Sequence, residues 1–387
     1  MSAFYSQTIK IICVVMRNQK TISLEGRTDD LQQDFLKVLN NRDLAKLLEI
    51  SYPQLIYHSL KTINSVTRYQ TFQVQKKSKG TRKICVPNKS LKIIQTKISQ
   101  ILYSIYEPKS CVHGYVVEKS IITNAKSHRR KEFILNLDIR DFFGSINLGR
   151  VRGLFIAKPF SLPKEVATTI ANLCCHENKL PQGAPSSPIL SNLICQQLDR
   201  ELQYFAQKNR LYYTRYADDI TFSSEYLESL KSLIKNLELV TENYPILLNN
   251  ELEYIFTKNG FTINQKKVRL LYPHQKQQVT GLIVNEKLNV DRKYIRNLRA
   301  ALYAWEKFGL EEASQVYLEK YAKTPTLRRK KKSSFIEAIR GKIEFLKNVR
   351  GESDPITRKF LDKYSELYEE YKKNVIQAKE EPDSQST

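Results

Sequence analysis

Residues 132–139 alternate between apolar and polar side chains with the two-residue period of a β-strand. One face of this strand would carry Phe133, Leu135, Leu137 and Ile139. The opposite face is less apolar and ends on Asp138. We therefore expect Asp138 to project from the end of the strand, away from its more apolar side.

Upstream of this strand, the pattern predicts helices followed by a hairpin. Residues 31–60 carry leucine and isoleucine at helical spacing. The runs 69–75 and 82–86 have strand character and flank a basic loop that closes at Gly80. These two runs are therefore predicted to form a β-hairpin with a basic tip.

Downstream, a turn-rich loop at 181–188 leads into a helix whose apolar stripe reaches Phe205. Ser187 is predicted to cap this helix and Pro188 to occupy its first position. The C-terminal region has two further helix signals, which are a capping box formed by Ser334 and Glu337 and a start at Asp354-Pro355.

The predicted fold class is α+β, with an antiparallel sheet covered by helices. Length and pattern suggest an N-terminal extension (1–30), a sheet-containing domain (31–290), a helical domain (291–372) and a disordered tail (373–387).

Asp218 and Asp219 form the most informative pair in the chain. They lie between an aromatic and branched run at 211–216 and an alternating run at 220–223, which predicts a hairpin with both acids at or beside its turn. Adjacent carboxylates repel each other unless a cation holds them, and Mg²⁺ prefers oxygen ligands. Together with Asp138, they suit a site for two Mg²⁺ ions that supports phosphoryl transfer.

The charge of the chain indicates a polyanionic partner. Lys and Arg number 63 against 40 acids, which gives a net charge of +23. Basic side chains are concentrated in residues 61–100, which contain no Asp or Glu, and in residues 289–350. Nucleic acid is the leading candidate, with a merely well-solvated basic surface as the alternative.

Cysteine spacing and hydropathy favour a cytoplasmic location. The six cysteines include no C-x-x-C pair, so neither a zinc ribbon nor a disulfide framework fits. The string Cys174-Cys175-His176 is more typical of ordinary packing than of a metal site. The apolar run at 9–16 is too short to span a bilayer, and we expect no membrane partner.

Four strings occur in the order of the palm motifs of reverse transcriptases. They are LDIRDFF at 137–143, LPQGAPSSP at 180–188, YADD at 216–219 and NGFTINQKK at 259–267. Two more, NAKSH at 124–128 and VTG at 279–281, resemble motifs of bacterial retron reverse transcriptases. The resemblance implies a right-hand polymerase with fingers, palm and a helical thumb from residue 291.

The resemblance also implies roles for individual residues in chemistry and nucleotide binding. Asp138 and Asp218 would be the principal metal ligands, assisted by Asp219 and the carbonyl of Ile139. Nucleotide binding would fall to Arg82, Lys79, Phe143, Gln182 and Gly183. Phe143 matches the ring that excludes ribonucleotides, although its position alone also fits a core aromatic. The lysines near Arg82 could equally bind template backbone.

A further set of residues would contact RNA. It comprises Asn124, His128, Val279, Thr280, Gly281, Arg292, Arg296, Arg299, Arg328 and Arg329. For Asn124 and His128 a role in local architecture is the alternative, for residues 279–281 a plain surface strand, and for the arginines a solvated helix face.

The retron resemblance implies an RNA-directed DNA polymerase that uses dNTPs. It would copy a cognate structured noncoding RNA into branched, RNA-linked single-stranded DNA from an internal 2′-hydroxyl. An effector or toxin protein encoded nearby and a role in antiphage defence are further implications. The alternatives are a reverse transcriptase of a group II intron, diversity-generating or abortive-infection lineage, and an RNA-binding antitoxin scaffold with little polymerase activity.

Overall fold

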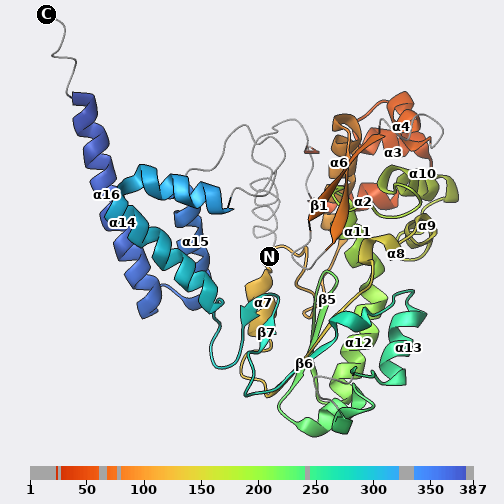
Figure 1. The fold of residues 1–387 in the computed structure, drawn as a ribbon. Coiled ribbons are helices and arrows are strands. Elements are labelled where there is room, and N and C mark those ends of the chain that lie inside the picture. The colour runs from red at the N-terminus through yellow and green to blue at the C-terminus, as the bar shows by residue number, and fades with distance from the viewer. Residues whose placement is uncertain are drawn as a thin grey trace, which may run out of the picture. The chain divides into compact units, whose positions relative to one another are not determined.

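The computed structural model describes residues 23–24, 28–60, 68–75, 80–239, 245–321 and 335–380 (Figure 1). Chain contacts separate two compact units. The first contains residues 1–124 and 132–271, and the second contains residues 125–131 and 272–387. Residues 272–290 therefore group with the C-terminal helices rather than with the sheet that precedes them. Across the described residues, no helix has both the length and the apolarity needed to cross a bilayer.

The first unit is organised around a four-stranded antiparallel sheet with the order β4-β5-β3-β6 (Figure 1). The strands are β3 (Phe133–Asp138), β4 (Tyr212–Tyr216), β5 (Asp219–Ser224) and β6 (Arg269–Leu271). Ile134 and Leu135 lie on opposite faces of β3 and are both fully buried. The sheet is therefore covered on both sides, and the strand predicted at 132–139 is confirmed as its interior strand.

Helices surround the sheet and a separate two-stranded ribbon of β1 (Tyr69–Gln75) and β2 (Thr81–Pro87), which is the predicted first hairpin. The region predicted as helical at 31–60 forms short helices because Asn40 and Ser51 cap new starts within it. The helices are α2 (Thr28–Leu36), α3 (Asn41–Leu47), α4 (Tyr52–Ser59), α6 (Lys89–Ile105), α7 (Ile121–Lys126), α8 (Phe142–Ser145), α9 (Leu148–Ile156), α10 (Lys164–Cys174) and α13 (Asn250–Lys258), with 3₁₀ turns η1 (Leu227–Ser232), η2 (Leu237–Leu239) and η3 (Gln265–Lys267).

The helix predicted after residue 188 is two helices, α11 (Ser187–Ile194) and α12 (Gln196–Lys208), which meet at Cys195. Ser187 is not the cap that the sequence suggested. Its hydroxyl donates to the Pro181 carbonyl at 2.7 Å, and it becomes the first helical residue with Pro188 second. The helix therefore begins one residue earlier because Ser187 bonds back to the preceding loop.

The second unit contains the hairpin β7 (Gln278–Val279) and β8 (Leu282–Ile283), followed by α14 (Arg292–Tyr321), α15 (Phe335–Arg350) and α16 (Pro355–Glu380). The α14 helix buries Leu298, Leu302 and Trp305, while Ile295 is half-buried. The α16 helix continues beyond residue 372, where the sequence suggested a disordered tail. Ser334 lies outside the described residues.

Asp354 joins the last two helices. Its carboxylate accepts a bidentate pair of bonds from Arg350 at 2.8 and 2.9 Å, and also bonds to the amides of Ile356 and Thr357 at the start of α16. The Arg350 bonds are the main reason that the pKa of Asp354 is lowered. Both side chains are 7% exposed, so neither can regain water if its partner is lost.

Asp354→Ala is expected to lower the free energy of unfolding of this unit by about 3–5 kcal/mol. Because the pKa of Asp354 is depressed by folding, its contribution is present above the ordinary aspartate pKa of about 4 and is lost as the pH falls below it. Urea unfolding followed through Trp305, the single tryptophan, measures this. The difference in unfolding free energy between the wild type and the variant should stay constant from about pH 7 to 5 and become smaller below about pH 4. A pH-independent gap, or an equal loss in the exposed control Asp362→Ala, would contradict the assignment.

Candidate active site

The three predicted carboxylates lie at one end of the sheet. Asp138 is the last residue of β3, and its partner across the ladder is Asp219, the first residue of β5. The amide of Ile139 donates to the carbonyl oxygen of Asp218 at 3.0 Å. The antiparallel register therefore brings together residues that are some eighty positions apart in the sequence.

A two-residue turn connects β4 to β5 and presents the acids. Tyr216 pairs with Asp219, which leaves Ala217 and Asp218 as the turn residues. Ala217 has φ of 58°, a left-handed conformation that is unfavourable for a residue with a Cβ. The position of Asp218 thus depends on a strained backbone held by its surroundings.

The electrostatics of the site favour a bound cation. Burial raises the pKa of Asp218, and the carboxylate of Asp138 raises it further. Desolvation, followed by repulsion from Asp218 and Asp138, raises the pKa of Asp219 to about 6. The positive charge of Lys267 lowers the pKa of both Asp218 and Asp219, and that of Arg82 lowers the pKa of Asp218. Both cations are therefore close enough to stabilise the charged form of these acids. A divalent ion between these acids would relieve the same repulsion.

Asp138 also has partners from the string at 259–267. Lys267 Nζ lies 2.5 Å from Asp138 Oδ1, and Asn264 Nδ2 lies 3.3 Å from Oδ2. The Asn264 amide donates to the Asp138 carbonyl at 2.8 Å. No group of three or more His, Cys, Asp or Glu side chains in the described part of the chain is placed to hold a metal ion by itself. The donor set still fits Mg²⁺, which commonly takes one or two carboxylates together with substrate phosphates.

The loop at 181–188 is attached to the β1–β2 hairpin. The Cys85 amide of β2 donates to the Gln182 carbonyl at 2.8 Å. Gly183 has φ of 114°, and a Cβ there would lie 3.0 Å from the Cys85 carbonyl oxygen, so glycine is required for this close approach. Gln182 Oε1 is buried without a hydrogen-bond partner among the described residues. Arg82 is exposed on the same hairpin, and Lys79 lies outside the described residues.

Phe143 and its neighbour Phe142 differ in their surroundings. Phe142 is buried and stacks on Phe261 at 5.9 Å between ring centroids. Phe143 is half-buried and lies 6.4 Å from the ring of Tyr115. The core position suggested as an alternative for Phe143 is therefore occupied by Phe142.

Tyr115 was not singled out from the sequence. Its pKa is raised to about 12 by burial and by the charge of Asp218. Asp218 and Phe143 thus both have Tyr115 as a neighbour. No motif around 115 signals this, because the contact depends on the fold. The sequence places Lys267 in the string at 259–267 but does not indicate its contact with the carboxylates.

The two retron-like strings contribute to the second unit. Residues 125–131 belong to it, and the Arg130 amide donates to the carbonyls of Val284 and Asn285 just after β8. Thr280 and Gly281 both have positive φ and form the turn of the β7–β8 hairpin. Asn124, His128 and Val279 are buried. This burial argues against direct RNA contact by these three side chains, and for Asn124 and His128 it favours the architectural alternative.

The arginines of α14 are placed differently. Arg292, Arg296 and Arg299 are exposed, and their spacing of four and three residues puts them on one face of the helix. Such a face can contact successive phosphates. Arg328 and Arg329 lie outside the described residues.

Comparison with known proteins identifies the class. Residues 74–285 match the family described as reverse transcriptase (RNA-dependent DNA polymerase). The retron Ec86 reverse transcriptase of Escherichia coli is 31% identical over 345 residues, covering 88% of this chain and 93% of that protein. The retron Mx65 reverse transcriptase of Myxococcus xanthus is 32% identical over 296 residues, covering 72% and 65%. The telomerase of Candida albicans, solved with a fragment of telomeric RNA, aligns with a TM-score of 0.42 at 11% identity over 80% of this chain and 65% of that one.

The chain belongs to the reverse transcriptase family, and within it to the bacterial retron enzymes. It is an RNA-directed DNA polymerase, and its template partner is RNA. The resemblance read from the palm strings and the predicted α+β class are thereby confirmed. Members of this family depend on divalent metal ions, which agrees with the acidic site at the end of β3.

Proposed function

We propose that this polymerase copies a structured noncoding RNA into single-stranded DNA that remains attached to the RNA at a 2′-hydroxyl, in antiphage defence. The observation that carries the chemistry is the register that sets Asp138 opposite Asp219 with Asp218 at the adjoining turn. Priming, the partner effector and the biological role are supported by the retron relatives and by the strings at 124–128 and 279–281.

Asp138, Asp218 and Asp219, with the Ile139 carbonyl, would hold two Mg²⁺ ions. When bound, such ions activate an attacking hydroxyl and stabilise the leaving oxygen. Lys267 partly compensates the charge of Asp138 through its contact at 2.5 Å. In the reaction the hydroxyl oxygen forms a bond to the α-phosphorus of the dNTP and loses its proton. The bond to pyrophosphate breaks.

Nucleotide binding would use residues from three elements. Arg82 is exposed on β2 and near enough to Asp218 to influence its charge, which suits a contact to the triphosphate. Gln182 offers a buried side-chain amide oxygen, Oε1, that lacks a partner among the described residues, and Gly183 allows the close backbone approach to β2 beside it. Lys79 would assist Arg82. Phe143, only half-buried, would pack against the sugar and exclude a 2′-hydroxyl.

RNA binding would use the exposed arginine face of α14. The basic block at 328–332, which lies outside the described residues, is a further candidate on its charge alone. Contacts of this kind fix register on the nucleic acid without reading its sequence. The buried residues of the two retron-like strings would act indirectly, by shaping the β7–β8 hairpin whose Gly281 is exposed.

The double substitution Asp218→Asn and Asp219→Asn is expected to reduce DNA synthesis by about 10³-fold or more, because cation binding supplies several kcal/mol and each 1.36 kcal/mol is a factor of ten. RNA affinity should change by less than about twofold, because neither side chain is placed in the RNA-binding face. Primer extension and filter binding measure the two quantities. Asp34→Asn, exposed on α2, is the matched control. DNA synthesis by the double variant would show that the ligands are wrongly assigned.

Phe143→Ala is expected to increase ribonucleotide over deoxyribonucleotide incorporation by about 10- to 100-fold, as loss of one steric contact is worth about 1–3 kcal/mol. The ratio of kcat/KM for a matched rNTP and dNTP measures this. Tyr204→Ala removes an aromatic ring that is 70% exposed on α12 and should leave the ratio unchanged. An unchanged ratio in the Phe143 variant would assign the ring a packing role.

DNA isolated from cells that express the chain with its flanking RNA gene should carry covalently attached RNA. A debranching enzyme that cleaves 2′–5′ bonds should release it, since priming from an internal 2′-hydroxyl leaves that linkage. Electrophoretic mobility before and after debranching is the measurement. Product with only 3′–5′ linkages would reject this mode of priming and favour another reverse transcriptase lineage. Absence of any DNA product, with RNA still bound, would favour the scaffold alternative.

A further inference from the structure

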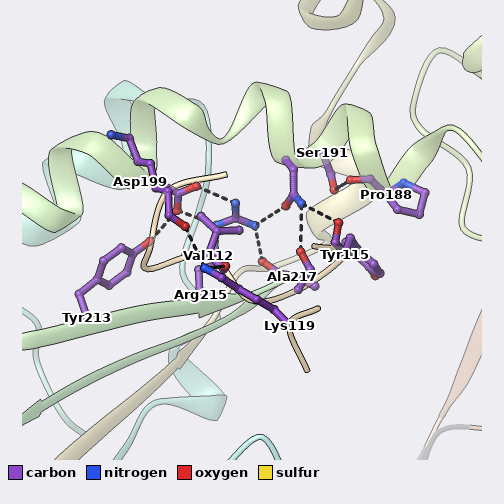
Figure 2. Close-up of polar contacts among 12 residues, drawn as sticks. Val112, Tyr115, Lys119, Pro188, Ser191, Asp199, Tyr213, Arg215 and Ala217 are labelled. Carbon is purple, nitrogen blue, oxygen red and sulfur yellow. Dashed lines mark hydrogen bonds and ion pairs between the residues drawn. The ribbon is translucent and has the colours of Figure 1, made fainter. Parts of the chain in front are cut away.

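Arg215 immediately precedes the YADD turn, and its side chain has no exposed surface. Its guanidinium makes a bidentate pair with Asp199 of α12, in which Nε donates to Oδ1 and Nη2 to Oδ2, both at 2.7 Å (Figure 2). The hydroxyl of Tyr213 donates to the same Asp199 at 2.7 Å. The ion pair is therefore fixed by two residues of strand β4 and one residue of helix α12.

The remaining guanidinium nitrogen reaches the turn itself. Arg215 Nη1 donates to the carbonyl oxygen of Ala217 at 3.2 Å and to Asn192 Oδ1 at 3.2 Å. Asn192, on α11, donates its own amide to the carbonyl of Gly114 at 2.9 Å. We call Arg215, Asp199 and Asn192 the buried clamp. It connects two helices to the backbone of the residue before Asp218.

A backbone segment closes the other side of the turn. Val112 forms a parallel bridge with Arg215, whose amide donates to the Cys111 carbonyl at 2.9 Å and whose carbonyl accepts from the His113 amide at 2.8 Å. Lys119 Nζ donates to the carbonyls of Ser110 and Val112, each at 2.8 Å, and so holds this segment in place (Figure 2).

Gly114 at the end of the segment touches the turn directly. A Cβ on Gly114 would lie 2.3 Å from the Ala217 nitrogen, which no real side chain could accept without movement of the backbone. Gly114 itself does not have a positive φ. Glycine is therefore needed at position 114 because the turn lies so close, and not because the backbone there has an unusual conformation.

We infer that the buried clamp and Gly114 are positioning elements that fix Asp218 relative to Asp138, and thereby set the affinity of the site for its cation. The left-handed Ala217 is intrinsically unfavourable, so the turn needs an external restraint. A buried Arg–Asp pair is a poor source of stability, because an apolar pair of similar volume often does as well. The bond from Nη1 to Ala217 explains why a charged, planar group is placed there.

The inference rests on the proposed function, in which Asp218 holds a divalent cation. Its test uses Arg215→Lys and Gly114→Ala in the full chain. Lysine keeps the charge but cannot bond to Asp199 and Ala217 together. Alanine at position 114 keeps the Arg215–Asp199 ion pair and displaces the turn by steric contact.

The first measurement is the Mn²⁺ affinity of the protein without nucleotide, determined from the electron paramagnetic resonance signal of free Mn²⁺. The second is the Mg²⁺ concentration that gives half-maximal DNA synthesis. Each variant should weaken Mn²⁺ binding by about 10- to 100-fold, as is typical for residues that support metal ligands. The Mg²⁺ midpoint should rise in parallel, while the RNA Kd and the dNTP KM at saturating Mg²⁺ should stay within about twofold.

Two matched controls separate positioning from folding. Arg350→Lys alters a second buried bidentate Arg–Asp pair, in the second unit, and should lower Tm without changing Mn²⁺ affinity. Gly153→Ala adds a methyl group in α9 that meets nothing within 4 Å. If Arg215→Lys and Gly114→Ala lower only Tm, as Arg350→Lys does, and bind Mn²⁺ normally, the inference is wrong.

Failure of the positioning inference can be distinguished from failure of the proposed function. If Asp218→Asn with Asp219→Asn abolishes Mn²⁺ binding while the clamp variants bind it normally, only the positioning inference fails. If the double variant binds Mn²⁺ and makes DNA, the assignment of the ligands fails first. If the Arg215→Lys variant does not fold, the Gly114→Ala variant alone tests the inference, because it keeps the Arg215–Asp199 ion pair.

Discussion

The pairing of β3 with β5 is the constraint on which the rest of the site depends. In this register Leu137 faces Ile220 and Asp138 faces Asp219 across the ladder. Both strands bury apolar side chains on two covered faces, so a slip by one residue would exchange the side chains of these faces and disrupt the packing on both. The hydrophobic core therefore fixes the register, and the register places the first aspartate beside the other two. The three carboxylates that we propose as metal ligands are thus aligned by packing that involves none of their own charge.

Burying three carboxylates together has an electrostatic cost. Desolvation first, and then repulsion from the neighbouring acids, raises the pKa of Asp218 and of Asp219. The surrounding chain offsets part of this cost. Lys267 contacts Asp138 directly, and Arg82 contributes from the adjoining hairpin. These charges do not fix where the Asp218 carboxylate lies. Contacts to the backbone of the Ala217–Asp218 turn do so: the Ile139 amide bonds to Asp218, and the Arg215 side chain and Gly114 contact Ala217.

The sequence revealed the elements whose signal is local. Alternation over 132–139 predicted β3, and the acids of the second hairpin fell at its turn, because strand period and turn chemistry are properties of a few neighbouring residues. The buried clamp could not be predicted in this way. Arg215 and Asp199 carry charges that usually lie at the surface, and only the fold shows that they pair in the interior. Gly114 gave no signal either, because what demands a glycine there is a turn about a hundred residues away.

The two retron-like strings show a similar limit. A motif match suggested RNA contact for Asn124, His128 and Val279, but all three are buried. Arg130, two residues after the first string, bonds to the backbone just beyond the second, so the strings are joined through main-chain contacts within one unit. A buried side chain can influence RNA only through the shape of the surface above it. Recognition that involves these strings would then act through the β7–β8 hairpin. In the proposed function, the exposed arginines of α14 would supply the phosphate contacts, which carry no sequence information.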